Sequence, residues 1–166
     1  MQNDVATEYL KSVRSRFAEV KLTAERTFAQ LADEQFHWAP NAESNSIAVI
    51  VKHMSGNMIS RWTDFFETDG EKSDRNRDGE FVAEGNSRAE LLAAWEKGWA
   101  TFLGTLSSIT EADLLRTIYI RKQPHSVIEA IERQMYHYSY HVGQIVYLAK
   151  MMKDADWQSL TIPRKR

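Results

Sequence analysis

The chain has 166 residues, with 21 basic and 23 acidic side chains, five histidines and no cysteine. This length suits a single domain over residues 1–166, and the lack of cysteine excludes disulfides, thiolate metal sites and a cysteine nucleophile. A net charge of −2 argues against nucleic-acid binding, and no membrane span or signal peptide is visible, so we expect a cytoplasmic protein with no membrane or nucleic-acid partner.

The first half of the chain predicts two amphipathic helices. From about residue 4 to residue 31, apolar side chains recur every three or four positions without Gly or Pro, which predicts one long helix. The turn-rich stretch 32–45 ends this helix. Capping residues precede Ile47, where a second helix begins and continues to the vicinity of Thr68. Residues 68–80 are polar and charged without apolar periodicity, which predicts an exposed loop.

Two capping boxes mark the helices of the second half. The first, at residues 87–90, predicts a helix that continues to Leu106. The second, at residues 126–129, predicts a helix that ends near Lys153. Residues 117–121 are β-branched and aromatic, but this extended segment is isolated, so we expect it to belong to a crossover connection and not to a sheet.

Four amphipathic helices without an alternating set of strands predict an all-α protein, a four-helix bundle. The connections 32–45 and 107–125 are long enough to cross the bundle, so a simple up-down-up-down order is not assured. The aromatic-rich helices offer an interface for a second copy. The basic end of the chain, residues 163–166, predicts a solvated terminus.

Three histidines are candidate metal ligands. His137 and His141 lie four residues apart on a predicted helix, so both imidazoles share one face within reach of a single ion. Catalytic divalent sites usually use a third protein ligand, and His53 on the second helix is the natural candidate, because bundles hold metals between facing helices. A surface histidine pair and a hydrogen-bonded core histidine are the alternative interpretation. No Glu follows the first histidine of the pair, which disfavours a zinc protease.

The remaining histidines do not extend this candidate site. His37 lies in the turn-rich stretch and His125 at the entrance of the last helix. Glu34 precedes His37 at the spacing of a di-iron bundle, but no other histidine has such a Glu, which excludes that class. Sequence spacing places no carboxylate beside the three candidate ligands, so no general base is identified. Arg61, two turns after His53, could meet an anionic substrate or form a surface ion pair.

Two segments resemble the DinB/YfiT-like superfamily. Residues 46–57, SIAVIVKHMSGN, resemble its second-helix signature, in which Gly and a polar residue closely follow a histidine. Residues 137–145, HYSYHVGQI, resemble its last-helix signature H-x-x-x-H-x-G-Q. Residues 57–78 are similar to an uncharacterised branch of the superfamily, and the resemblance covers nearly the whole chain.

The resemblance implies an up-down-down-up four-helix bundle with long crossover connections, often a homodimer. It also implies a divalent metal ion, most often zinc or nickel, on His53, His137 and His141. Members include metal-dependent hydrolases and enzymes that use low-molecular-weight thiols. We therefore expect a metal-dependent enzyme that acts on a small-molecule substrate by hydrolysis or by transfer of a low-molecular-weight thiol, which must be a cosubstrate because the chain has no cysteine. The alternative is a non-catalytic bundle that binds a ligand or partner, with a structural or vestigial metal site.

Overall fold

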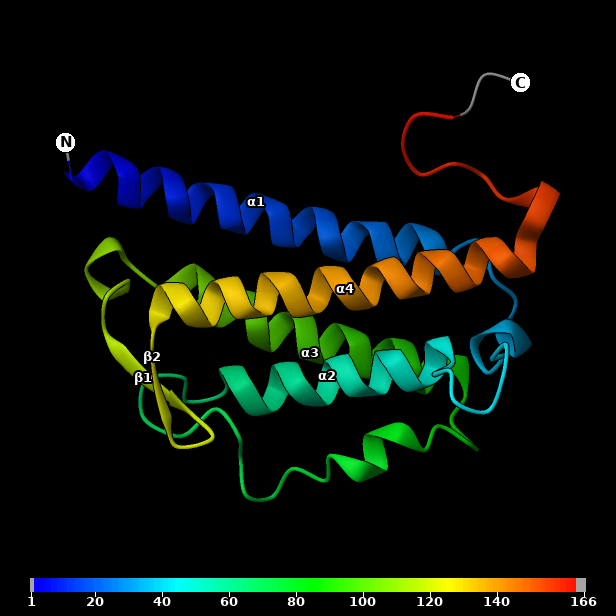
Figure 1. Ribbon diagram of the computed structural model, residues 1–166, viewed down its shortest axis with the longest axis horizontal. Coiled ribbons are helices and arrows are strands. Elements are labelled where there is room, and N and C mark those ends of the chain that lie inside the picture. The colour runs from blue at the N-terminus through cyan, green and yellow to red at the C-terminus, as the bar shows by residue number, and fades with distance from the viewer. Residues whose placement is uncertain (1, 164–166) are drawn as a thin grey trace.

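The computed structural model describes residues 2–163, with side chains described from residue 5 onward, so the basic end at 164–166 lies outside the described residues (Figure 1). The structure is mostly helical, with one small sheet, and within the described residues no helix is long and apolar enough to cross a membrane. The elements are α1 (Gln2–Phe28), η1 (Asp33–Phe36), α2 (Ile47–Trp62), η2 (Asp78–Phe81), α3 (Arg88–Ser108), η3 (Glu111–Asp113), β1 (Thr117–Ile120), β2 (Gln123–Ser126), α4 (Val127–Lys153) and η4 (Asp154–Asp156).

Side-chain caps determine where three of the long helices begin. Ser46 accepts a hydrogen bond from the backbone amide of Val49 at the start of α2. Both predicted capping boxes are confirmed, one at residues 87–90 before α3 and one at 126–129 before α4. α2 ends at Trp62 and not near Thr68 as predicted, because the backbone becomes extended at the next residue and then left-handed.

The four long helices lie alongside one another, with α2 packed on α3 and α1 packed on α4 (Figure 1). α2 and α3 run in the same direction: Gly98 of α3 approaches Ser55, and about two turns further along both helices Thr105 donates a hydrogen bond to the carbonyl of Trp62. α1 and α4 run together in the opposite direction, as the colours of Figure 1 show. The chain must therefore return along the bundle between α2 and α3, and residues 63–87 make this return.

The prediction of an exposed loop is wrong for much of residues 68–80, because this segment packs along α2. The hydroxyl of Ser60 on α2 donates to the carbonyl of Gly70 over 3.2 Å and accepts from the amide of Lys72 over 3.0 Å. Glu80 is buried, at 7% exposure. Polar groups that satisfy one another can be buried without any apolar periodicity, which is why the sequence pattern of this segment resembled that of a solvated loop.

The expectation of no sheet in the connection before α4 is also wrong. β1 pairs with β2 in an antiparallel hairpin, joined by Arg121 and Lys122, whose φ angles of 54° and 62° are those of a tight two-residue hairpin turn. The carboxylate of Asp69 accepts hydrogen bonds from both turn amides, at 2.8 and 2.6 Å. This turn contains neither Asn nor Gly, the residues that normally identify such a hairpin in a sequence. The carboxylate of Asp69, more than 50 residues away in the chain, stabilises the turn instead.

Aromatic side chains fill the centre of the core. Phe17, Phe102 and Tyr138 from three helices pack edge to face, with ring centroids 4.5 Å apart for the first two and 5.4 Å apart for the last two. Trp99 joins them, with its ring centroid 5.6 Å from that of Tyr138. All four side chains are fully buried. The hydroxyl of Tyr138 on α4 donates to Oδ1 of Asn57 on α2 over 3.3 Å, which connects this cluster to both helices that carry the candidate metal ligands.

We expect Gly98→Ala to lower the free energy of unfolding by about 1–3 kcal/mol, because the new methyl group overpacks the contact between α2 and α3. A Cβ at this position would lie 2.9 Å from the Cα of Ser55. Gly104 on the same helix is the matched control, since a Cβ there meets no described atom within 4 Å. Its replacement by Ala should stabilise by up to about 1 kcal/mol. Urea denaturation measures both changes, and equal effects would contradict the close packing.

Candidate metal centre

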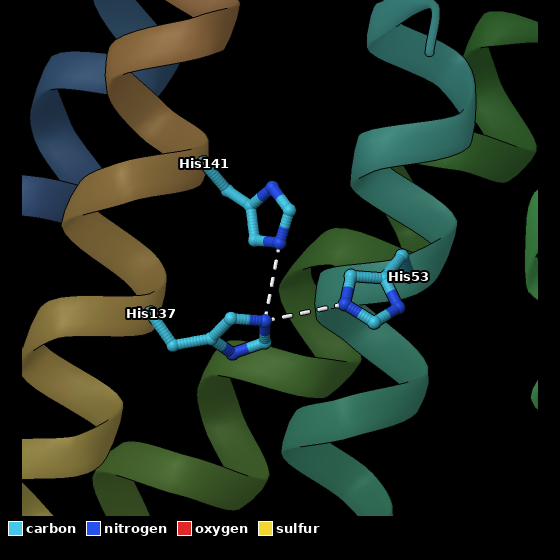
Figure 2. A group of neighbouring side chains, drawn as sticks. All are labelled: His53, His137 and His141. Carbon is cyan, nitrogen blue, oxygen red and sulfur yellow. Dashed lines mark hydrogen bonds between the residues drawn. The ribbon is translucent and has the colours of Figure 1, made fainter. Parts of the chain in front are cut away.

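The facing surfaces of α2 and α4 bring His53, His137 and His141 together (Figure 2). His137 and His141 extend from α4 and His53 from α2, with their rings directed towards one another. The Nε2 atom of His137 lies 3.2 Å from that of His53 and 3.1 Å from that of His141. One ligand atom of each residue lies within 4.8 Å of those of the other two, so the cluster could hold a metal ion.

The outer ring nitrogens of two histidines are bound to protein oxygen atoms. His53 Nδ1 lies 3.0 Å from Oε2 of Glu80, and His141 Nδ1 lies 2.8 Å from Oε1 of Gln144. A carboxylate or amide oxygen only accepts, so both Nδ1 atoms carry hydrogen and donate it. In a neutral imidazole the other nitrogen, Nε2, then presents a lone pair. These hydrogen bonds orient the rings and prepare them to bind a cation.

The arrangement of the three Nε2 atoms is typical of a cation-binding site. The lone pairs of His53 and His141 both face Nε2 of His137, which has at most one hydrogen and can satisfy only one of them when the ring is neutral. Zinc binds imidazole nitrogen at about 2.0–2.1 Å, so neighbouring ligand nitrogens lie roughly 3 to 3.5 Å apart. The distances of 3.2 and 3.1 Å fall in this range. The donor set therefore fits a divalent ion.

The protonation of the cluster also suits a metal. Burial, together with the neighbouring histidines and Arg61, lowers the pKa of His137 to about 3. Burial likewise lowers the pKa of His141 to about 4. Both rings are therefore neutral at physiological pH, and the neutral imidazole is the form that binds a metal.

Glu80 completes the support of His53 from the connection between α2 and α3. Its carboxylate also receives two hydrogen bonds from Arg75, from Nε to Oε1 at 2.7 Å and from Nη2 to Oε2 at 2.8 Å. Burial by itself would raise the pKa of Glu80, but the hydrogen bonds from His53 and Arg75 outweigh burial and lower the pKa. An ionised carboxylate therefore holds the imidazole and makes it a stronger ligand.

Gly56 allows this carboxylate to approach α2. A Cβ on Gly56 would lie 2.1 Å from Oε1 of Glu80, so any larger residue would displace the carboxylate. Sequence reasoning missed Glu80 because 27 residues separate it from His53. A glycine one turn after a buried histidine was the available signal, since it marks a helix position where another group comes close.

A cavity of about 260 Å³ opens beside His53 and His137. It is lined by residues of α2, α4, the connection 63–87 and the hairpin turn, including five arginines: Arg61, Arg75, Arg77, Arg121 and Arg133. Arg61 is 2% exposed, so its ion pair with Glu71 is buried and does not lie on the surface as the alternative expected.

The two other histidines lie apart from the cluster, as expected. His37 is exposed, and Nδ1 of His125 lies 3.0 Å from the backbone carbonyl of Gln123 in its own hairpin. Neither residue belongs to the group of side chains that could hold a metal ion.

Two comparisons with known proteins complete the description of the site. The model of a family described as "Protein of unknown function (DUF1572)" matches residues 4–166. No curated protein matches the chain. The family match covers all three histidines and the cavity beside them but assigns them no role, so the function has to be argued from the site itself.

Proposed function

The chain belongs to the DUF1572 family, and we propose that it is a metal-dependent enzyme whose divalent ion is bound by His53, His137 and His141. The observation that carries the proposal is the convergence of three Nε2 atoms, two of which present lone pairs to the third. An all-imidazole donor set suits zinc or nickel. Three neutral ligands leave the positive charge of the ion available for substrate chemistry.

We also propose that the helices form the up-down-down-up four-helix bundle of the DinB/YfiT-like superfamily. The parallel pairing of α2 with α3 supports this assignment, as does the long return of residues 63–87 between them. The position of the histidines supports it further, with one on α2 and two on α4. The expected homodimer stays a prediction.

The surroundings of the histidines favour an enzyme over a non-catalytic binding protein. An ionised carboxylate, Glu80, touches one ligand, and the cavity beside His53 and His137 has room for a small molecule. When bound, the ion supplies Lewis acidity, which activates a water molecule or a low-molecular-weight thiol as a nucleophile near neutral pH. The thiol would enter as a cosubstrate, because the chain contains no cysteine.

The chain's own residues hold the site in one arrangement. Arg75 fixes the carboxylate of Glu80, which accepts the Nδ1 hydrogen of His53 and so places the lone pair of the neutral ring on Nε2. Gln144 does the same for His141 from the next turn of α4. These hydrogen bonds hold two of the three rings in a fixed orientation before an ion binds.

Metal analysis tests the proposal directly. Protein purified without a metal column should contain about one divalent ion per chain, as a site with three protein ligands predicts. His53→Ala should remove most of this metal, whereas His37→Ala, an exposed histidine outside the cluster, should leave the content unchanged. Elemental analysis by mass spectrometry measures all three proteins. Equally little metal in wild type and His53→Ala would refute the site.

A further inference from the structure

Arg61 is a buried cation without full hydrogen bonding. Its side chain is 3% exposed and lines the cavity beside the histidines. Among the described residues, its Nε and Nη1 atoms have no hydrogen-bond partner. Burial lowers its pKa to about 10, so the guanidinium still carries its charge at physiological pH. A buried guanidinium with two unpaired nitrogen atoms is costly unless a ligand compensates for them.

The carboxylates near the cavity are already engaged by other arginines. Glu80 binds Arg75 through both of its oxygens. Glu71 lies 3.5 Å from Nη2 of Arg61, but the same oxygen lies 3.2 Å from Arg121, and its other oxygen receives a hydrogen bond from Arg75. The two carboxylates therefore cannot neutralise the five guanidinium groups that line the cavity. Its wall carries an excess of positive charge.

A second buried polar group in the same cavity also lacks a partner. Gln134 on α4 is 1% exposed and lines the cavity, and its Oε1 has no hydrogen-bond partner among the described residues. Buried amide oxygens are almost always satisfied. The unsatisfied donors of Arg61 point to an acceptor group on a ligand, and the unsatisfied oxygen of Gln134 points to a hydrogen-bond donor on another part of the same ligand.

We propose that this cavity binds the carboxylate or phosphate group of a small anionic substrate, and that Arg61 anchors this group. The assignment rests on the proposed metal-dependent function, because it places the anion at one end of a substrate whose reacting part lies at the histidines. Arg61 follows His53 by eight residues, which separates their Cα atoms by about 12 Å along a helix. The substrate is therefore held by its anionic group at a point distinct from the metal ligands.

The planar fork of a guanidinium suits both carboxylate and phosphate oxygens, because two parallel N–H groups can bind two oxygens at once. Nε and Nη1 of Arg61 have no partner among the described residues, and Nη2, which forms a parallel pair with either of them, has only a 3.5 Å ion-pair contact with Glu71. A cavity of about 260 Å³ restricts the ligand to a molecule of a few carbon atoms beyond the anionic group.

Calorimetric titration of the metal-loaded protein tests the proposal with inorganic phosphate, with acetate and with neutral acetamide. Phosphate or acetate should bind saturably, and the tighter of the two identifies the anionic group, whereas acetamide should not bind. Arg61→Gln should weaken anion binding at least about tenfold, because it removes a charged hydrogen-bond donor pair. Arg61→Lys, which keeps the charge but loses the fork, should restore part of the affinity.

Two comparisons make the result specific to Arg61. Arg16→Gln, an exposed arginine paired with Glu19 on α1, should leave anion binding unchanged. Anion binding that is absent, or equal in wild type and Arg61→Gln, overturns the anion site. Metal content is measured on the same samples, so that a failure of metal binding overturns the proposed function separately from the anion site.

Thermal unfolding distinguishes ligand binding from a structural role. Arg61→Gln should lower Tm little, because two nitrogen atoms of the buried guanidinium are unpaired and its ion pair with Glu71 is long, at 3.5 Å. Arg75→Gln is the matched comparison: its side chain is nearly as buried, at 5% exposure, but it is fully paired with Glu71 and Glu80, so its loss should lower Tm. An equal fall in Tm for both variants would assign Arg61 to the support of the fold and overturn the proposal.

Discussion

Zinc added to metal-free protein should raise Tm by roughly 8–16 °C once free zinc exceeds the Kd about a thousandfold. An ion that binds only the folded chain stabilises it by about 4 kcal/mol at this excess. Each kcal/mol shifts Tm by roughly 2–4 °C for a domain of this size. The three histidines meet only in the folded protein, since they come from α2 and α4. Differential scanning fluorimetry after chelator treatment measures the shift.

His137→Ala should abolish most of this shift, because Nε2 of His137 is the atom that lies close to both other ligand nitrogens. His125→Ala is the matched control and should keep the shift, since its ring contacts the backbone of its own hairpin and is not a member of the three-histidine cluster. A zinc-dependent rise in Tm that is the same in wild type and His137→Ala would mean that zinc binds elsewhere on the chain.

Glu80→Ala should lower the free energy of unfolding by about 3–5 kcal/mol, because it leaves the buried guanidinium of Arg75 without its main partner. The same change should weaken metal binding by about 10- to 100-fold, since His53 loses the carboxylate that orients it. Urea denaturation and zinc titration measure the two effects. Glu84→Ala, an exposed residue of the same connection, should change stability by less than about 0.5 kcal/mol.

Gly56→Ala provides a second variant that keeps the carboxylate but displaces it. The added methyl group would overlap Oε1 of Glu80, so the hydrogen bond to His53 has to lengthen or break. We expect weaker zinc binding than in wild type, with the carboxylate still present to pair with Arg75. Unchanged zinc affinity in both Gly56→Ala and Glu80→Ala would show that Glu80 does not support the ligand.

The helices could be read from the sequence because their determinants are local. Apolar residues at three- and four-residue spacing and the capping boxes at 87–90 and 126–129 act within one or two turns of the chain. For the same reason the pairing of His137 with His141 was predictable, since four residues of helix fix two side chains on one face. His53 could be proposed as a third member because it interrupts an otherwise apolar helix.

The hairpin could not be predicted, because its stability depends on a distant side chain. Arg121 and Lys122 are unusual residues for a tight turn with positive φ. Asp69 makes the turn possible by accepting hydrogen bonds from both backbone amides. No local preference of the residues in the turn contains this information.

The sequence by itself determined the four long helices and the three histidines that could hold a metal, because helix periodicity and capping are short-range properties. Only the tertiary structure decided what surrounds these histidines: the buried carboxylate of Glu80, the cavity and the incompletely paired guanidinium of Arg61. These groups lie in or against a polar connection whose composition resembles that of a solvated loop. Polar side chains become buried when partners from distant segments satisfy their hydrogen bonds and charges, and the folded chain alone brings those partners together.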